Sequence, residues 1–392
     1  MIALAEAQAR LIALAVPVSS ENVPLALANG RWLAADVIAK RTRPARDLSA
    51  MDGYALRALT GRSQWRVVGE SAAGSPFSGA IGTDEAVRIS TGAALPDGAD
   101  TILIQENTTR TGDALVQSAG VPPLCGQHVR ALGSDFSAGT VLISAGSRLN
   151  PAKIALAAMA GHGALPVCRR VKVAMLSTGN ELVAPGSATD DDHIPATNAL
   201  MVMAMLDGWP VEMIDGGIIA DDLDTLTAAI AACRDADIIV TSGGASVGDH
   251  DLVRPALIAA GASLDFWKVA MRPGKPVMSG RLGQSLVLGL PGNPVSAFVT
   301  ATLLLKPAIA ALGGASDPMP QVQTAILGAP LPPVTARTDH IRGRFENNRV
   351  IPVGWDDSSA LRGLSEAALL IVRPASSPAA NIGDFVQFIA LT

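Results

Sequence analysis

The stretch Asp237-Ile-Ile-Val-Thr-Ser-Gly-Gly-Ala-Ser-Val-Gly248 decides the fold class of this chain. Its apolar, β-branched first half is typical of a strand buried on both faces, and its glycine-rich second half is typical of a loop that leads into a helix. The same order recurs where Val171–Ser177 leads into Thr178-Gly-Asn and where Ser285–Leu290 leads into Pro291-Gly-Asn-Pro. Repeated strand–loop–helix units predict an α/β domain with a parallel sheet covered on both faces.

The segments around these units complete the predicted domain. Apolar residues at helical spacing predict helices at the N-terminus (where Glu6 and Arg10 share a face), over about 198–207 and 223–234, from Leu252, and from Pro294 to Leu312, with a further strand at 211–214.

The sequence on either side of this domain has a different pattern. Short alternations between residues 48 and 134 predict a small β domain, with strands at 65–68, 86–90, 100–104 and 114–117. A helix is predicted from Leu149 to Gly161, because Pro151 lies in its first turn. Short strands from about Gln321 predict a terminal β domain.

Composition excludes several classes of protein. The 392 residues carry a formal net charge of −5, which argues against nonspecific nucleic-acid binding. We expect no membrane span, because Lys306 and Pro307 interrupt the longest apolar run, residues 297–313. Three widely spaced cysteines form no disulfide framework, which fits a cytoplasmic protein.

The three glycine-containing loops are candidate binding elements. Ligands of open parallel sheets bind beyond the carboxyl ends of the strands, where backbone N–H groups suit phosphate. Asn293 before Pro294 is also a well-formed helix start on structural grounds alone. The candidate substrate-binding residues are Thr178, Gly179, Ser242, Gly243, Gly244, Ser246, Gly248, Pro291, Gly292, Asn293 and Pro294.

Carboxylates accompany these loops. Glu181 follows the first loop, Asp221 and Asp222 open a helix, and Asp249 and Asp251 follow the second loop. Each could simply complement a helix dipole. Together beside phosphate-binding loops they favour a cation, and Mg²⁺ is the natural candidate. Zinc is disfavoured, because the five histidines show no metal-binding spacing.

A basic cluster, Lys268, Arg272 and Lys275, has the opposite sign. Three cations in eight residues around a Pro-Gly turn predict an anion clamp, although a charged, solvated turn is the alternative.

Several strings, taken in order, match one family. They are Met-Asp-Gly-Tyr-Ala (51–55), Ser-Thr-Gly-Asn-Glu-Leu (177–182), Ser-Gly-Gly-Ala-Ser-Val-Gly-Asp-His-Asp (242–251), Arg-Pro-Gly-Lys-Pro (272–276) and Gly-Leu-Pro-Gly-Asn-Pro-Val-Ser (289–296). The chain resembles the molybdopterin molybdenumtransferases (MoeA, the molybdenum insertases), the family that includes the gephyrin E domain. The resemblance covers nearly the whole chain.

The resemblance implies an elongated homodimer of four-domain subunits. The domains expected are an elongated helical and strand linker domain (1–43 plus 135–170), a small β domain (44–134), a central α/β sandwich of the molybdopterin-binding type (171–315) and a C-terminal β-barrel-like domain (316–392). Asp52 of one subunit is expected to face the α/β domain of the other.

The resemblance also implies a reaction. Family members insert molybdenum from molybdate into adenylylated molybdopterin and release AMP in a Mg²⁺-dependent hydrolysis. The implied catalytic residues are Asp52, Thr91, Glu181, Asp221, Asp251, Lys268 and Lys275, with Glu181, Asp221 and Asp251 as metal ligands. The implied molybdate-binding residues are Arg272, Lys275, Ser296, Arg342 and Ser359. Contact with the adenylyltransferase and with downstream cofactor enzymes is implied as well.

Two departures and two alternatives accompany this interpretation. The family usually has Lys where Arg272 stands and Asp where Ala196 stands. A molybdopterin adenylyltransferase shares the α/β domain, but the flanking β domains argue against that activity. A non-catalytic, gephyrin-like scaffold is the other alternative, and the retained acidic and basic residues argue against it.

Overall fold

The computed structural model describes residues 1–392 except 60, 189, 245–251, 355, 356, 358 and 392. The chain forms two compact units. Unit 1 comprises Met1–Ala35, Ala145–Asn150 and Ala164–Thr392, and unit 2 comprises Asp36–Ser144 and Pro151–Gly163. The four domain borders expected from the sequence stay a prediction.

A six-stranded sheet forms the centre of unit 1. Its strands, in spatial order, are β16 (Val211–Ile219), β13 (Val171–Thr178), β17 (Ile238–Ser242), β21 (Ser285–Leu290), β20 (Met278–Leu282) and β18 (Ser263–Trp267). The first four strands are parallel, as predicted. The prediction of a wholly parallel sheet is wrong at β20, which runs antiparallel to both neighbours. Only Gly283 and Gln284 separate β20 from β21, and so short a connection joins antiparallel strands.

Alternate residues of the central strands enter two different hydrophobic clusters. Val173 and Met175 of β13 contribute to one cluster, and Ala174 and Leu176 contribute to the other. This alternation is the two-residue period of a strand, and it explains the continuous apolar runs in the sequence. Both faces of the sheet are therefore buried, as predicted.

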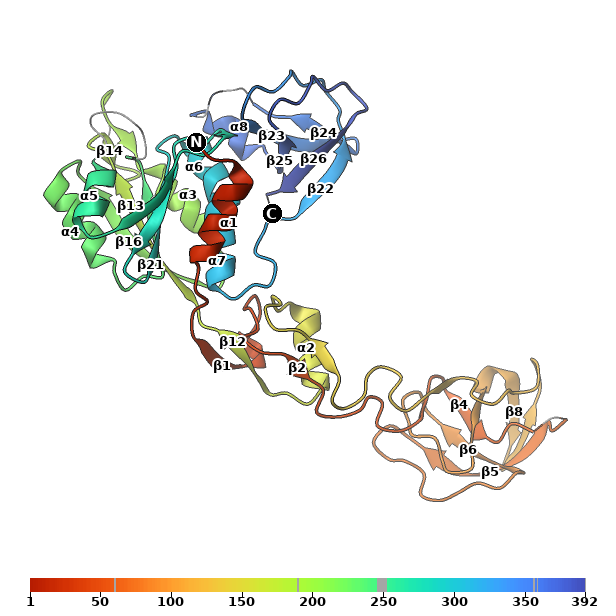
Figure 1. Cartoon of the computed structure of the whole chain (residues 1–392). Coiled ribbons are helices and arrows are strands. Elements are labelled where there is room, and N and C mark those ends of the chain that lie inside the picture. Colours follow the sequence, from red (N-terminus) through yellow and green to blue (C-terminus); the bar gives the residue numbers. More distant parts are fainter. Residues whose placement is uncertain (60, 189, 245–251, 355–356, 358, 392) are drawn as a thin grey trace. The chain divides into compact units, whose positions relative to one another are not determined.

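Helices cover each face (Figure 1). One face packs against α1 (Leu4–Leu14), α3 (Thr197–Met205) and the long helical run that starts at Pro294. The other face packs against α4 (Leu223–Ala232) and α5 (Val253–Ala259). All these helices were predicted, and Arg10 and Glu6 form the expected pair at 2.6 Å.

The long helical run continues through Lys306 and Pro307, the two residues that interrupt its apolar sequence. It consists of α6 (Pro294–Thr300), a π-helical segment (Ala301–Leu305) and α7 (Lys306–Leu312). By length and hydropathy the run Pro294–Leu312 would suffice to cross a membrane, yet 83% of its most apolar window is buried within the fold. It is the central buried helix of unit 1.

Pro307 is accommodated by the turn that precedes it. Proline has no N–H to donate to the carbonyl four residues earlier, and in a regular α-helix its ring would clash with that carbonyl. Here that carbonyl belongs to Leu303, which lies in the wider π turn. The Nε2 of Gln8, a buried residue of α1, donates to the Leu303 oxygen at 2.9 Å. The N-terminal helix therefore satisfies the acceptor that Pro307 leaves open.

A second sheet of unit 1 is built mainly from the C-terminal residues. Its order is β19 (Met271–Arg272), β23 (Thr338–Glu346), β25 (Leu369–Arg373), β26 (Phe385–Ala390) and β22 (Val322–Ile326), with β24 (Arg349–Pro352) beside β23. A bridge between Leu327 and Val350 connects the β22 end to β24. The predicted terminal strands are confirmed, and β19, from between β18 and β20, joins them.

The remaining elements of unit 1 are short. They are β1 (Ser20–Pro24) paired with β12 (Ala164–Cys168), β14 (Leu182–Val183) paired with β15 (Ile194–Pro195), the 3₁₀ turn Leu25–Leu27 and α8 (Leu361–Ser365).

Unit 2 is a small β structure, and its predicted strands and helix are confirmed. Its sheet has the order β7 (Thr101–Ile104), β4 (Gly53–Leu56), β6 (Glu85–Ile89), β5 (Gln64–Ser71), β9 (Ala114–Gln117) and β8 (Thr108–Thr111). The pairs β3 (Leu48–Ser49) with β10 (Val129–Arg130) and β2 (Val37–Ile38) with β11 (Val141–Ile143), the 3₁₀ turn Gln105–Asn107 and helix α2 (Pro151–Met159) complete the unit.

We predict that Gln8→Leu destabilises unit 1 by about 1–3 kcal/mol, because the Leu303 carbonyl would lose the buried hydrogen bond from Gln8. Urea unfolding measures the loss. In the Pro307→Ala background the same substitution should cost less, because the backbone N–H that alanine restores at this position can reach that carbonyl. Equal costs in both backgrounds would contradict the assignment.

Candidate active site

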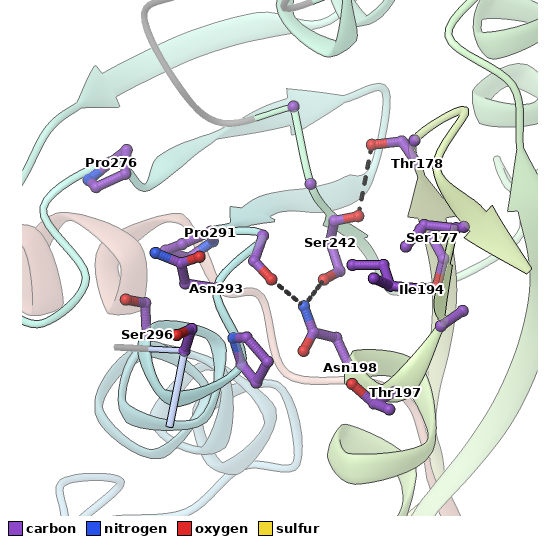
Figure 2. A pocket seen from close by; sticks show the side chains of 18 of the residues that line it. Ser177, Thr178, Ile194, Thr197, Asn198, Ser242, Pro276, Pro291, Asn293 and Ser296 are labelled. Atoms are coloured by element: carbon purple, nitrogen blue, oxygen red, sulfur yellow. Dashed lines mark hydrogen bonds between the residues drawn. The ribbon is translucent and has the colours of Figure 1, made fainter. Parts of the chain in front are cut away.

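A large cavity of unit 1 lies at the carboxyl ends of β13, β17 and β21. It has a volume of about 1060 Å³, and Figure 2 shows residues that line it. The lining residues that the sequence predicted are Thr178, Gly179, Glu181, Asp221, Ser242, Gly243, Gly244, Arg272, Lys275, Pro291, Gly292, Asn293, Pro294, Ser296 and Ser359. The cavity therefore brings together all three predicted loops, two predicted carboxylates and two predicted cations.

The strand ends pack closely at this cavity. The Gly243 N–H donates to the Leu290 carbonyl at 3.3 Å, and the Thr178 hydroxyl donates to the Ser242 carbonyl at 3.4 Å. A Cβ added at Gly243 would lie 2.3 Å from the Thr178 carbonyl oxygen, so no larger residue fits there. The glycine is needed because two loops approach each other at that point.

Asp221 and Asp222, which the sequence presents as one pair, have different roles. Asp222 is the N-cap of α4, since its side chain accepts from the Thr225 N–H at 2.8 Å and from the Thr225 hydroxyl at 2.7 Å. These bonds lower the pKa of Asp222. Asp221 lines the cavity and exchanges hydrogen bonds with Asn180: the Asn180 N–H donates to Oδ2 at 3.3 Å, and the Asp221 N–H donates to the Asn180 side chain at 3.0 Å.

Glu181 lies close to the first loop. A Cβ added at Gly179 would lie 2.5 Å from a carboxylate oxygen of Glu181, so the glycine leaves room for that carboxylate. Glu181 and Asp221 both line the cavity beside the loops. Mg²⁺ is typically held by one or two protein carboxylates together with substrate phosphates, so these two oxygen donors fit it. Within the described residues, no group of three His, Cys, Asp or Glu side chains forms a metal site by itself.

The basic side of the cavity contains Lys275, Arg272 and Arg337. The guanidinium of Arg272 forms a two-pronged pair with Asp339, at 2.9 and 2.6 Å, and β19 and β23 pair beside it. Asp339 is 3% exposed. The planar fork of a guanidinium suits this two-pronged pairing better than a lysine ammonium group would. Arg272 thus joins the terminal sheet to the cavity wall.

A second, smaller cavity of about 60 Å³ adjoins the first. It shares Arg272 and Pro273 with the larger cavity and is also lined by Arg342. Arg342 is buried and donates to the carbonyls of Ala360 and Asp357 at 2.8 and 3.2 Å. The predicted molybdate-binding residues are therefore divided: Lys275, Ser296 and Ser359 line the larger cavity, Arg342 lines the smaller, and Arg272 lines both.

His340, next to Arg342 in the small cavity, lines it as well. It is 3% exposed, and its Nδ1 has no hydrogen-bond partner among the described residues. Burial lowers the pKa of His340 to about 4, so the imidazole is neutral at pH 7.

Lys268 does not line either cavity. Its ammonium lies 5.0 Å from the centre of the Trp267 ring, and its backbone φ is 95°. A non-glycine residue with this φ is uncommon and marks a tightly constrained turn.

Asp52 and Thr91 belong to unit 2 and contact each other. The Thr91 N–H and hydroxyl donate to one carboxylate oxygen of Asp52 at 2.7 and 3.0 Å, and these bonds lower the pKa of Asp52. Three other predicted residues, Ser246, Gly248 and Asp251, lie outside the described residues, as does Asp249.

Asn198 and Arg337 are among the cavity residues that sequence reasoning missed. Asn198 lies in α3, and its side chain donates to Ser242 and to the Gly292 carbonyl. Arg337 lies just before β23, 62 positions after Lys275, so no local pattern links the two. The sequence signal for Asn198 was its place two residues after Ala196, a position that the resemblance had singled out and that lines the cavity as well.

Comparison with known proteins identifies the family. Residues 2–161 match the family model "MoeA N-terminal region (domain I and II)", and residues 174–311 match "Probable molybdopterin binding domain". The molybdopterin molybdenumtransferase of Haemophilus influenzae is 36% identical over 382 residues, which cover 95% of this chain and 94% of that protein. The chain belongs to the molybdopterin molybdenumtransferase family.

Other members of the molybdopterin molybdenumtransferase family agree. Molybdopterin molybdenumtransferase 2 of Mycobacterium tuberculosis is 33% identical over 386 residues, 95% of each chain. The crystal structure of the molybdopterin biosynthesis MoeA protein from Pyrococcus horikoshii OT3 superposes with a TM-score of 0.85 at 26% identity and covers 100% of both chains. The relatives thus match this chain over nearly its whole length.

We predict that Arg272→Ala destabilises unit 1 by about 2 kcal/mol, because buried Asp339 would lose its partner. The predicted loss is smaller than the usual cost of breaking a buried ion pair, because Arg272 is partly exposed. Arg344→Ala is the control: Arg344 pairs with exposed Glu346 and Glu366, so its loss should cost under about 1 kcal/mol. Equal urea midpoints for the Arg272→Ala and Arg344→Ala variants would contradict the larger role assigned to the Arg272–Asp339 pair.

We predict that burial of His340 makes the free energy of unfolding fall at acidic pH. Its folded pKa of about 4 lies below the ordinary value of 6.5, so the unfolded chain takes up the proton first as pH falls. Stability should decrease between pH 6.5 and pH 4, by up to about 3 kcal/mol at about 1.4 kcal/mol per pKa unit. Urea unfolding at a series of pH values measures this loss, and His340→Phe should lose less stability than the wild type between pH 6.5 and pH 4. The same pH dependence in both proteins would exclude His340 as its source.

Proposed function

We propose that this chain is a molybdopterin molybdenumtransferase, which takes adenylylated molybdopterin and molybdate, inserts molybdenum at the dithiolene and releases AMP. The observation that carries this proposal is the single cavity in which three glycine-containing loops, Glu181 and Asp221, and Arg272, Lys275 and Arg337 meet. The loops of such a cavity suit a substrate that contains a phosphoanhydride, and its cations suit a second substrate that is a tetrahedral dianion.

The loops would bind the pyrophosphate of the substrate. Backbone N–H groups at the ends of parallel strands stabilise phosphate oxygens without adding a full charge. Glu181 and Asp221 would hold Mg²⁺ against the phosphates. When bound there, Mg²⁺ supplies charge neutralisation of the phosphate oxygens during hydrolysis.

The basic side of the cavity would bind molybdate. Lys275 forms no ion pair with a described side chain, so its charge is available to an oxyanion. Ser296 and Ser359 could add hydroxyl donors. Arg272 would contribute less charge than a free arginine, because Asp339 already pairs with it. We infer that its main contribution is to hold the turn that carries Lys275.

The hydrolysis would follow from positioning and charge. Water adds to a phosphorus of the phosphoanhydride, one P–O bond breaks, and AMP departs. None of the three cysteines lines the cavity, so within the described residues no protein thiolate is positioned for a covalent step.

The finer properties of the family are part of the same proposal. We propose a homodimer in which Asp52 and Thr91 of one subunit complete the site of the other, contact with the adenylyltransferase and downstream cofactor enzymes, and a cytoplasmic location. The hydrogen-bonded Asp52–Thr91 pair supports a preorganised carboxylate in unit 2.

The test is to supply adenylylated molybdopterin, Mg²⁺ and molybdate and to measure AMP. We expect AMP release that depends on molybdate. Consumption of ATP with molybdopterin would instead indicate an adenylyltransferase, and neither activity would indicate a non-catalytic scaffold.

We predict that Asp221→Asn lowers the rate of AMP release by about 100-fold or more and raises the Mg²⁺ concentration needed for half-maximal rate, because one of the two carboxylates that line the described part of the cavity loses its charge. The neighbouring substitution Asp222→Asn is a matched control. Asparagine caps a helix about as well as aspartate, so its rate and Mg²⁺ dependence should stay within about 2-fold of the wild type. Equal effects of the two substitutions would exclude Asp221 as the metal ligand.

A further inference from the structure

Asn198 connects two of the three loops through one side chain. It is the second residue of α3, and its Nδ2 donates to the Ser242 hydroxyl at 2.8 Å and to the Gly292 carbonyl at 2.7 Å. Ser242 ends β17, and Gly292 lies in the loop that follows β21. Figure 2 shows both hydrogen bonds converging on the Asn198 amide.

The orientation of this amide is determined by its partners. The Gly292 carbonyl only accepts hydrogen bonds, so the atom facing it is the NH₂ group. The other amide atom, Oδ1, is consequently buried without a partner among the described residues. The two hydrogen bonds to Ser242 and Gly292 therefore determine which way the amide points.

Holding the Gly292 carbonyl also sets the direction of a donor. In a planar trans peptide the N–H points opposite to the C=O, so the bond from Asn198 fixes the direction of the Asn293 N–H. On the other side, the bond to Ser242 anchors the residue directly before Gly243 and Gly244, which line the cavity. Both loops also contact each other through Gly243 and Leu290. One carboxamide thus sets the spacing between two sets of backbone donors.

We propose that Asn198 is a positioning residue that sets the spacing of the second and third loops for the pyrophosphate group of the substrate. This inference rests on the proposed function for the identity of the substrate. Asn198 itself would affect binding through the loops, without touching the reacting phosphorus.

Asn198→Leu tests the inference, because leucine retains a similar volume and removes both hydrogen bonds. We expect the melting temperature to stay within about 3 °C of the wild type, because Gly292 is exposed and water can replace the donor that its carbonyl loses. We expect KM for adenylylated molybdopterin to rise about 10-fold, with kcat within about 3-fold. Asn381→Leu, at an exposed position of the terminal domain, is the control for the substitution itself.

Binding of inorganic pyrophosphate with Mg²⁺, followed by calorimetry, gives a second measurement that is independent of turnover. Asn198→Leu should weaken it about 10-fold, and Ser242→Ala should weaken it less, because only one of the two bonds is lost. In the double variant the two effects should not add, since both act on the same contact.

The outcomes separate this inference from the proposed function. If wild-type protein releases no AMP but Asn198→Leu still weakens pyrophosphate binding, the proposed function fails and the positioning role stands. If AMP release proceeds and Asn198→Leu matches the wild type in KM and in pyrophosphate affinity, the positioning role is overturned. A large fall in melting temperature with activity lost in proportion to unfolded protein would also overturn it, because the role would then be structural.

Discussion

The parallel arrangement of β13, β17 and β21, each buried on both faces, is the constraint on which the rest of unit 1 depends. Strands buried on both sides cannot shift register without moving apolar side chains out of two packed clusters. Their carboxyl ends are therefore held at one edge of the sheet, and the three loops that follow them meet there. The cavity is a consequence of the sheet.

Segments far apart in sequence stabilise this arrangement. The N-terminal helix supplies Gln8 to a carbonyl inside the long central helix, and the terminal sheet supplies Asp339 to Arg272. In both cases a polar group buried by the fold finds its partner on another element, as buried polar groups generally must. The α/β part and the terminal sheet thus form one unit, and the cavity wall includes Arg337, Ser359 and Leu361 from the C-terminal part of the chain.

Electrostatic roles within the site differ for residues that look alike in sequence. Asp221 and Asp222 are adjacent, yet one faces the cavity and the other caps a helix. Arg272 and Lys275 belong to one basic motif, yet Arg272 pairs with a buried carboxylate while Lys275 faces the cavity. Charge counts in a motif therefore overestimate the charge that a ligand meets, because ion pairs within the protein neutralise part of it.

The sequence by itself determined most elements of unit 1 and the loops that line the cavity. Periodicity and glycine-rich loops were sufficient to predict four strands of the central sheet, namely β13, β16, β17 and β21. They also predicted the helices on its faces and the loops that line the cavity, since all of these are local patterns along the chain. Only the tertiary structure decided that Gln8 donates to the Leu303 carbonyl, that Asp339 pairs with Arg272, and that Asn198 connects two loops. These contacts join residues up to 295 positions apart, and no pattern within a window of sequence records which distant partner a buried polar group will meet.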